Sequence, residues 1–132
     1  MRNLIFLISL VGILFANPNK MQVFQPPSST CPQSWFEDME NITNDINVVT
    51  IMNVKNLKKD IGVPKEIQSC NTTIMADFVF EGNVPSSAIK DFLEKKPKNA
   101  MGLALPSSEN GKDEKKVFLI FEDSTYKLFG IY

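Results

Sequence analysis

The spacing of apolar residues predicts a strand, a helix and a second strand at the start of the ordered chain. In "KMQVFQ", residues 20–25, apolar and polar side chains alternate, which is typical of a strand with one buried face. From Trp35 onward, apolar residues recur at steps of three and four, which predicts an amphipathic helix from about Cys31 to Asn44. The β-branched run "INVVTIMNV", residues 46–54, then predicts a buried strand.

The middle of the chain predicts two helices with a hairpin between them. "NLKKDIG", residues 56–62, predicts a short helix that a glycine ends, and "VPKEIQSC", residues 63–70, predicts a turn or half helix. The apolar runs at 72–75 and 78–81 predict the two strands of a hairpin. "VPSSAIKDFLEKKP", residues 84–97, predicts an amphipathic helix that a proline stops.

The end of the chain predicts a second hairpin after an irregular stretch. "AMGLALPSS", residues 100–108, predicts no regular element, and the charge run "ENGKDEKK", residues 109–116, predicts a solvated loop. Residues 116–132 predict a hairpin around Asp123 and Ser124. A βαβ unit followed by a hairpin and a helix is the thioredoxin plan. We therefore expect a thioredoxin-like α/β fold with a mixed four- to five-stranded sheet and helices packed on it.

The N-terminus has the pattern of a secretory signal peptide. One arginine precedes an apolar run from Leu4 to Ala16, and the run ends in a small residue. Thirteen residues are too few for a membrane-spanning helix, which needs about 20, so an uncleaved anchor is the weaker alternative. We predict a signal peptide over 1–16, a single domain over 17–132, and a periplasmic or secreted protein that leaves the membrane after cleavage.

Charge and composition exclude several classes of function. Removing Arg2 from fourteen basic residues leaves thirteen lysines against fifteen acids, a net charge of about −2, so nucleic-acid binding is not expected. The chain has no histidine, and therefore lacks the commonest general base. Carboxylates such as Glu81 are scattered without the spacing of an acid–base pair, and no phosphate loop or nucleophile elbow is present. A binding protein without catalytic residues is favoured over an enzyme.

The two cysteines are the strongest candidates for chemistry. Outside the cytosol, two cysteines in a small domain predict a disulfide by default. Cys31 stands at the predicted tip of the first helix, where the helix dipole favours the thiolate. Cys70 lies just before the first hairpin, which faces the same corner in a thioredoxin-like fold. We expect the two Sγ atoms to lie within bonding or near-bonding reach.

Two long stretches of the mature chain carry a family resemblance. They are "VFQPPSSTCPQSWFEDM", residues 23–39, and "IGVPKEIQSCNTTIMADFVFEGNVPSSAIKDFLEKKP", residues 61–97, and "MGLALP" and the terminal hairpin add to them. On these residues the chain resembles the small CopG-type proteins of bacterial copper-resistance systems, long catalogued as a domain of unknown function. The resemblance covers nearly the whole mature chain and implies a multi-copper thiolate cluster.

The chain departs from that family at the cysteines. Aligned without gaps from Val23 to Trp35, the three clustered cysteines of the family fall on Ser29, Cys31 and Pro32, so only the middle thiol is kept. The fourth cysteine of the family corresponds to Cys70. A multi-copper cluster needs several soft ligands, and this chain keeps two.

The chain also departs at the histidines and at one loop. Asn71 and Asn83 stand where the family has histidines, and the charged "SSENGKDEKK" replaces a loop rich in methionine and glycine. The resemblance therefore supports the fold more firmly than the metal site.

Three interpretations of the cysteine pair stay open. A disulfide between Cys31 and Cys70 would close a loop of 40 residues and contribute about 4 kcal/mol to stability. A second interpretation is a residual site in which the two thiolates hold Cu(I) in linear geometry. Thiol–disulfide exchange is the third, and the lack of a Cys-x-x-Cys pair disfavours it.

The methionines offer one weaker metal contact. Met101 lies in the irregular "AMGLALP" and is kept as a copper contact, whereas Met21, Met39, Met52 and Met75 lie on predicted apolar faces and are expected in the core. The resemblance implies extracytoplasmic handling of a metal, with copper as the expected ion. The alternative is a disulfide-stabilised protein that binds an extracytoplasmic protein partner without metal, and the third is a thiol oxidoreductase.

Overall fold

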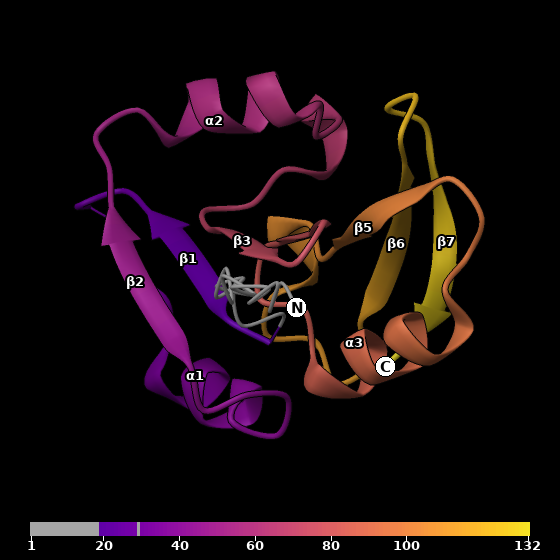
Figure 1. Cartoon of the computed structure of the whole chain (residues 1–132), viewed down its shortest axis with the longest axis horizontal. Helices are drawn as coiled ribbons and strands as arrows, with labels where there is room; N and C mark the ends of the chain where they lie inside the picture. Colours follow the sequence, from indigo (N-terminus) through magenta and orange to yellow (C-terminus); the bar gives the residue numbers. More distant parts are fainter. Residues whose placement is uncertain (1–18, 29) are drawn as a thin grey trace, which may run out of the picture.

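One mixed sheet of seven strands forms the centre of the computed structural model, which describes residues 19–28 and 30–132 (Figure 1). The predicted signal peptide and Ser29 lie outside the described residues. Within the described part of the chain, no helix is both long enough and apolar enough to cross a membrane.

The elements follow one another as β1 (Met21–Gln25), α1 (Gln33–Met39), β2 (Ile46–Thr50), α2 (Val54–Ile61), the 3₁₀ helix η1 (Lys65–Ile67), β3 (Thr72–Met75), β4 (Phe78–Glu81), α3 (Ser86–Lys95), β5 (Ala100–Ala104), the 3₁₀ helix η2 (Ser107–Glu109), β6 (Lys116–Phe121) and β7 (Tyr126–Ile131). The strand order across the sheet is β2-β1-β3-β4-β5-β6-β7. The pairs β1–β2 and β4–β5 are parallel, and the other neighbours are antiparallel.

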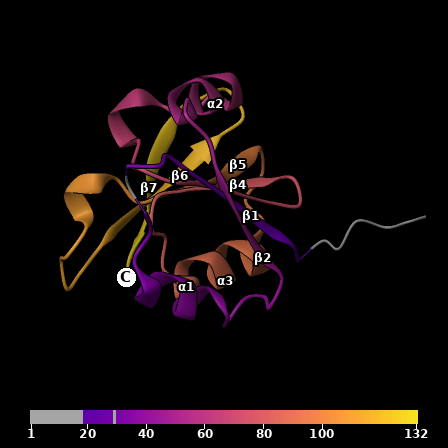
Figure 2. The same cartoon turned by 90° about the vertical axis from the view of Figure 1, so that its left-hand side faces the viewer.

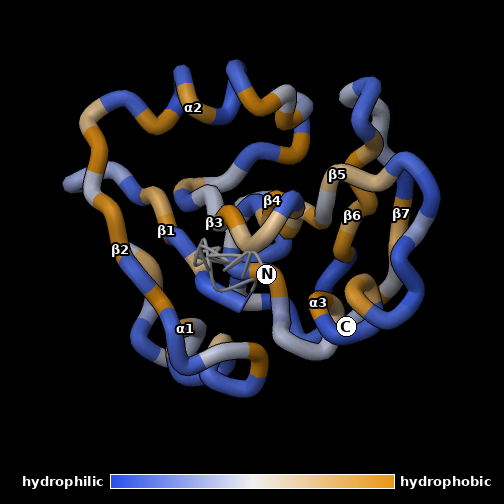
Figure 3. The backbone as a smooth tube through the Cα atoms, viewed as in Figure 1, coloured by the Kyte–Doolittle hydropathy of each residue, from blue (hydrophilic) through white to orange (hydrophobic). Residues whose placement is uncertain are grey.

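The helices cover both faces of the sheet. Figure 2 shows α2 over one face, and α1 and α3 over the opposite face. Hydrophilic and hydrophobic positions are mixed along α2, as the hydropathy colouring of Figure 3 shows, which is typical of a helix with one face toward solvent. The sheet is therefore the middle layer between two unequal helical layers.

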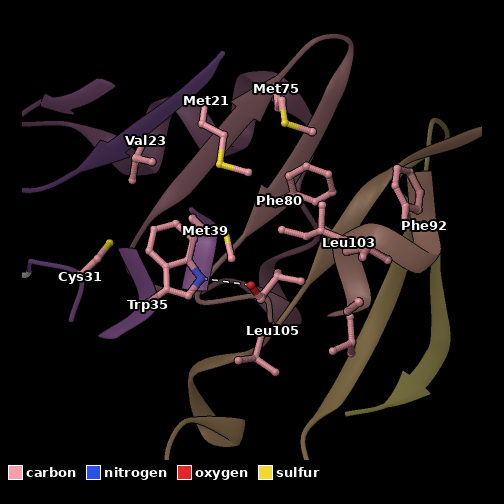
Figure 4. Packing of buried hydrophobic residues seen from close by; sticks show 14 of the residues in the cluster. Met21, Val23, Cys31, Trp35, Met39, Met75, Phe80, Phe92, Leu103 and Leu105 are labelled. Atoms are coloured by element: carbon pink, nitrogen blue, oxygen red, sulfur yellow. Dashed lines mark hydrogen bonds between the residues drawn. The ribbon is translucent and has the colours of Figure 1, made fainter. Parts of the chain in front are cut away.

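The larger core lies between the sheet and the pair α1 and α3. Trp35 of α1 packs into this core, and its indole Nε1 donates a hydrogen bond to the carbonyl of Val84 at 3.1 Å (Figure 4). Phe92 of α3 makes edge-to-face ring contacts with Phe78 and Phe80 of β4. A smaller cluster lies on the α2 side and contains Val63, Ile67, Val79, Ala104 and Ile120.

Most of the predicted elements are present, with two differences in length. The strand at 20–25, both hairpins and the helices at 56–62 and 84–97 are confirmed within a few residues. The first helix is shorter than predicted and ends at Met39, because the backbone turns tightly from Asp38 to Thr43. The second strand ends at Thr50, and α2 begins four residues later.

The prediction of four to five strands is wrong, because the stretch predicted to be irregular forms β5. A Cβ added at Gly102 would lie 1.7 Å from the carbonyl oxygen of Val79, so glycine is what lets β5 pair closely with β4. The register of β5 against β6 also shifts between Ala100 and Gly102. With β5 in place, the terminal hairpin joins the sheet and raises it to seven strands.

We predict that Gly102→Ala strongly destabilises the protein, because the added methyl group meets backbone and not a movable side chain. The expected loss is about 3 kcal/mol or more in the free energy of unfolding, measured by urea denaturation. Gly111→Ala is the control, because nothing lies within 4 Å of its Cβ position and only its positive φ is strained. That control should lose about 1 kcal/mol. Equal losses in the two variants would contradict the close approach of β5 to β4.

Candidate functional site

The sheet brings the two cysteines to the same end of neighbouring strands. Cys31 follows β1, and its backbone N–H donates to the side-chain oxygen of Gln25 at 3.1 Å. Cys70 lies two residues before β3. Because β1 and β3 are antiparallel and Phe24 pairs with Thr72, the end of β1 lies beside the start of β3. The structure thus brings together two residues that are far apart in the sequence.

Both cysteines are free thiols, and they differ in environment. Cys31 is buried at one end of the large core, near Trp35 and Val23 (Figure 4). Cys70 is half-buried, and its thiol donates to the side-chain oxygen of Asn71 at 3.3 Å. The Cys31 thiol therefore lies on the core side of the site, and the Cys70 thiol lies nearer the solvent.

The two thiols interact electrostatically. Burial and, to a smaller extent, negative charge on Cys70 raise the pKa of Cys31, the nearby Lys58 cation lowers it, and the net result is a pKa of about 12. The prediction that a helix tip favours the Cys31 thiolate is therefore wrong. The helix begins only at Gln33, and the cost of burying a charge outweighs the dipole.

A buried ion pair lies beside the thiols. Lys58 of α2 donates from Nζ to Glu81 Oε2 at 2.5 Å and to the hydroxyl of Thr72 at 2.7 Å. The Thr72 hydroxyl donates to Glu81 Oε1 at 2.6 Å, and the backbone N–H of Ser69 donates to Glu81 Oε2 at 2.8 Å. Burial raises the pKa of Glu81, whereas the Lys58 charge and these hydrogen bonds lower it.

This ion pair positions Cys70. Glu81 holds the backbone of Ser69, the residue before the thiol, and Lys58 attaches α2 to β3 and β4. Sequence reasoning missed both residues, since Glu81 was treated as one of several scattered carboxylates. The available signal was the spacing of Lys58, which lies four residues after Val54 on the buried side of α2.

A cavity of about 480 Å³ opens next to Cys70. Its lining residues come from the β1–α1 connection, the start of α2 and the segment before β3: Pro26, Ser28, Met52, Asn53, Val54, Lys55, Lys58, Gln68, Ser69 and Cys70. No carboxylate lines it, so it offers no charged oxygen to a hard cation such as Ca²⁺ or Mg²⁺. Cys70 and Met52 supply two sulfur atoms to this cavity.

The expected place of Met52 in the core is wrong. Its side chain is 87% exposed, because it lies in the connection between β2 and α2 and not on a buried strand. Met21, Met39 and Met75 are buried as predicted. Met101 lies in β5, half-buried against the small core cluster, and does not line the cavity beside Cys70.

Asn71 and Asn83, which the resemblance places at histidine positions of the family, lie in different surroundings. Asn71 is buried, donates from Nδ2 to the carbonyl of Gly82 at 3.3 Å, and accepts from the Cys70 thiol through Oδ1. Asn83 lines a different cavity of about 420 Å³ together with Pro32, and its Oδ1 is buried without a hydrogen-bond partner. An amide oxygen is not the soft donor that Cu(I) prefers, so neither asparagine extends the thiol pair as a copper ligand.

The donor set limits what metal could bind. Among residues 19–28 and 30–132, no group of three or more His, Cys, Asp or Glu side chains could hold a metal ion. A cluster of several ions, as the resemblance implies, does not fit these residues. The soft donors at this corner are the thiols of Cys31 and Cys70, of which only Cys70 lines the cavity, and thiolates are among the ligands that Cu(I) prefers.

The family model described as "Protein of unknown function, DUF411" matches residues 67–111, a segment that contains Cys70, β3, β4, α3 and β5. Over this third of its length the chain is similar to the DUF411 family. No curated protein matches the chain.

Two solved structures share the fold, and both carry the name copper resistance protein CopG. Form 1 matches with a TM-score of 0.68 and 20% identity over 88% of this chain and 98% of the CopG chain. Form 2 matches with a TM-score of 0.72 and 19% identity over 88% of this chain and 99% of the CopG chain. The chain therefore shares its fold with these CopG structures over most of its length, as the resemblance predicted.

We predict that Lys58→Met destabilises the protein by about 3–5 kcal/mol at neutral pH, because it leaves Glu81 buried without its counter-charge. Removing Lys58 also raises the pKa of Glu81 further, since the Lys58 charge lowers it in the native protein. A carboxyl with a raised folded-state pKa loses stability as the pH rises through that pKa. The deficit should therefore shrink as the pH falls toward the ordinary pKa of glutamate.

Urea denaturation over a pH series measures this effect. Lys59→Met is the matched control, because Lys59 is the exposed neighbour in the same helix. Its stability should stay within about 0.5 kcal/mol of the native protein. A Lys58→Met deficit that does not change with pH would show that Glu81 is not the group left unpaired.

Proposed function

We propose that this protein is an exported copper-handling protein that holds one Cu(I) between Cys31 and Cys70. The observation that carries the proposal is the position of the two thiols, which lie at one end of adjacent strands, close enough for Cys70 to act electrostatically on Cys31. Cu(I) is a soft ion, and two thiolates suit its linear coordination. Copper is chosen because the structures that share the fold are named copper resistance proteins.

The surroundings of the thiols suit a copper–thiolate unit. Two thiolates and one Cu(I) carry a net charge of −1, and the Lys58 cation lies within electrostatic range of Cys31. Because burial raises the pKa of Cys31 to about 12, this thiol keeps its proton at neutral pH. Binding of Cu(I) must displace that proton, so the affinity should rise with pH.

A structural disulfide without metal is the second candidate. It is supported by the loss of the other family ligands, since Pro32 has no metal-binding side chain and Asn71 is used in a hydrogen bond to Gly82. In that case the chain would be a disulfide-stabilised partner of another extracytoplasmic protein. A thioredoxin-like plan with thiol–disulfide exchange is the third candidate, and the raised pKa of Cys31 argues against a reactive thiolate.

We predict that the reduced mature chain binds one Cu(I) under anaerobic conditions, and that Cys31→Ser and Cys70→Ser each abolish tight binding. Each variant removes one of the two thiolates that hold the ion, which is the reason for equal losses. Titration against a chromogenic Cu(I) chelator measures the affinity. Ser87→Ala, at an exposed position of α3, is the control and should bind as the native chain does.

The redox state of the native protein separates the two candidates. The structural disulfide is supported if the isolated chain has no free thiols, melts at a lower temperature after reduction, and binds no Cu(I) in either state. These results would overturn the copper site. Cu(I) bound equally well by Cys31→Ser would contradict a site shared by the two thiols.

Export is tested independently of metal. The apolar run that ends at Ala16 should direct the chain out of the cytoplasm, and cleavage should leave Asn17 as the first residue. Mass spectrometry of protein recovered from the periplasm of a bacterial host measures the N-terminus. An intact Met1 with retention in the membrane would overturn export by a cleaved signal peptide.

A further inference from the structure

Met52 has an exposed apolar side chain, and the backbone on both sides of it is anchored. At 87%, it is the most exposed of the large hydrophobic side chains that the structure describes. Burial of a methionine side chain contributes roughly 1.5–3 kcal/mol, and Met52 gains almost none of this. Its place in the chain is therefore not explained by packing.

The backbone on both sides of Met52 is anchored. The N–H of Ile51 donates to the carbonyl of Gln25 at 3.0 Å, which ties this connection to the end of β1. On the other side, Asn53 caps α2, and its Oδ1 accepts from the N–H of Asn56 at 3.2 Å. These two anchors hold Met52 beside the segment that leads from β1 to Cys31.

Met52 shares the cavity of about 480 Å³ with Cys70. The two residues come from different segments of the chain, since Met52 precedes α2 and Cys70 precedes β3, and Cys31 is not part of the lining. Methionine has three rotatable side-chain bonds, and at this exposure its sulfur can turn toward the thiol without displacing the core. The lining also contains the cations Lys55 and Lys58 but no carboxylate.

We propose that Met52 is a third copper ligand, which binds through Sδ to a Cu(I) held at Cys70 and Cys31. This inference rests on the proposed copper function and adds a ligand to it. A thioether is a soft donor that suits Cu(I), and it carries no charge. The complex therefore keeps the net charge of −1 that the lysines of the cavity favour. The site would be a three-sulfur site that opens to solvent on the Met52 side.

The test compares Met52→Leu with the native mature chain, using Cu(I) alone as the probe under anaerobic conditions. Leucine is close to methionine in volume and lacks sulfur, and at an exposed position it should leave the melting temperature unchanged. Met75→Leu, at a buried strand position outside the cavity, is the matched control for removal of a methionine sulfur. Chelator competition measures the affinity of each chain.

Met52→Leu should weaken Cu(I) binding at least as much as loss of an outer-shell partner weakens a metal site. Such a loss lowers metal affinity roughly 10- to 100-fold. X-ray absorption of selenomethionine-labelled chains gives a second measurement. A selenium neighbour of copper should be present in the labelled native chain and in Met75→Leu, and absent from Met52→Leu.

The outcomes separate this inference from the proposed function. Tight Cu(I) binding by the native chain, with equal affinity in Met52→Leu and no selenium neighbour, overturns the role of Met52 and leaves the two-thiol site intact. Absence of Cu(I) binding by the reduced native chain overturns both the copper function and the third ligand. Weaker binding in Met52→Leu together with loss of the selenium neighbour supports the three-sulfur site.

Discussion

The buried pair of Lys58 and Glu81 is the constraint on which the geometry of the thiol site depends. Taking two charges out of water costs several kcal/mol per ion, so such a pair persists only where hydrogen bonds satisfy both groups. Here Thr72 and the backbone of Ser69 complete the set. The pair joins a helix on one face of the sheet to two central strands and to the segment that carries Cys70. The pair therefore fixes Lys58 and Ser69, two of the residues that line the cavity beside that thiol.

The parts of the fold that sequence could predict are those governed by local rules. Alternation of apolar residues located β1, apolar runs located the two hairpins, and the glycine after Ile61 marked the end of α2. The strand β5 was missed because its pairing depends on the absence of a side chain at Gly102 facing the backbone of Val79, which is far away in the sequence. Lys58 was also missed, because a charged side chain is not expected at a buried position of a helix.

The candidate site was predictable in its thiols but not in its surroundings. Cys31 and Cys70 stand out by composition alone, whereas the electrostatic effect of burial on Cys31 depends on how Trp35 and the sheet cover it. Met52 was misplaced because apolar character alone says nothing about whether a connection lies at the surface. Asn71, which the resemblance places at a histidine position, is held in the structure by the hydrogen bond from its amide to the carbonyl of Gly82.

Trp35 is the single tryptophan of the chain, and it is buried in the same core cluster as Cys31. Its indole is fixed by the hydrogen bond to Val84, so its environment changes only when this corner of the molecule changes. Tryptophan fluorescence, excited at wavelengths longer than those that tyrosine absorbs, consequently originates beside the thiol site. Intrinsic fluorescence therefore provides a label-free optical signal for oxidation, metal loading or local opening at that corner, with little contribution from the rest of the fold.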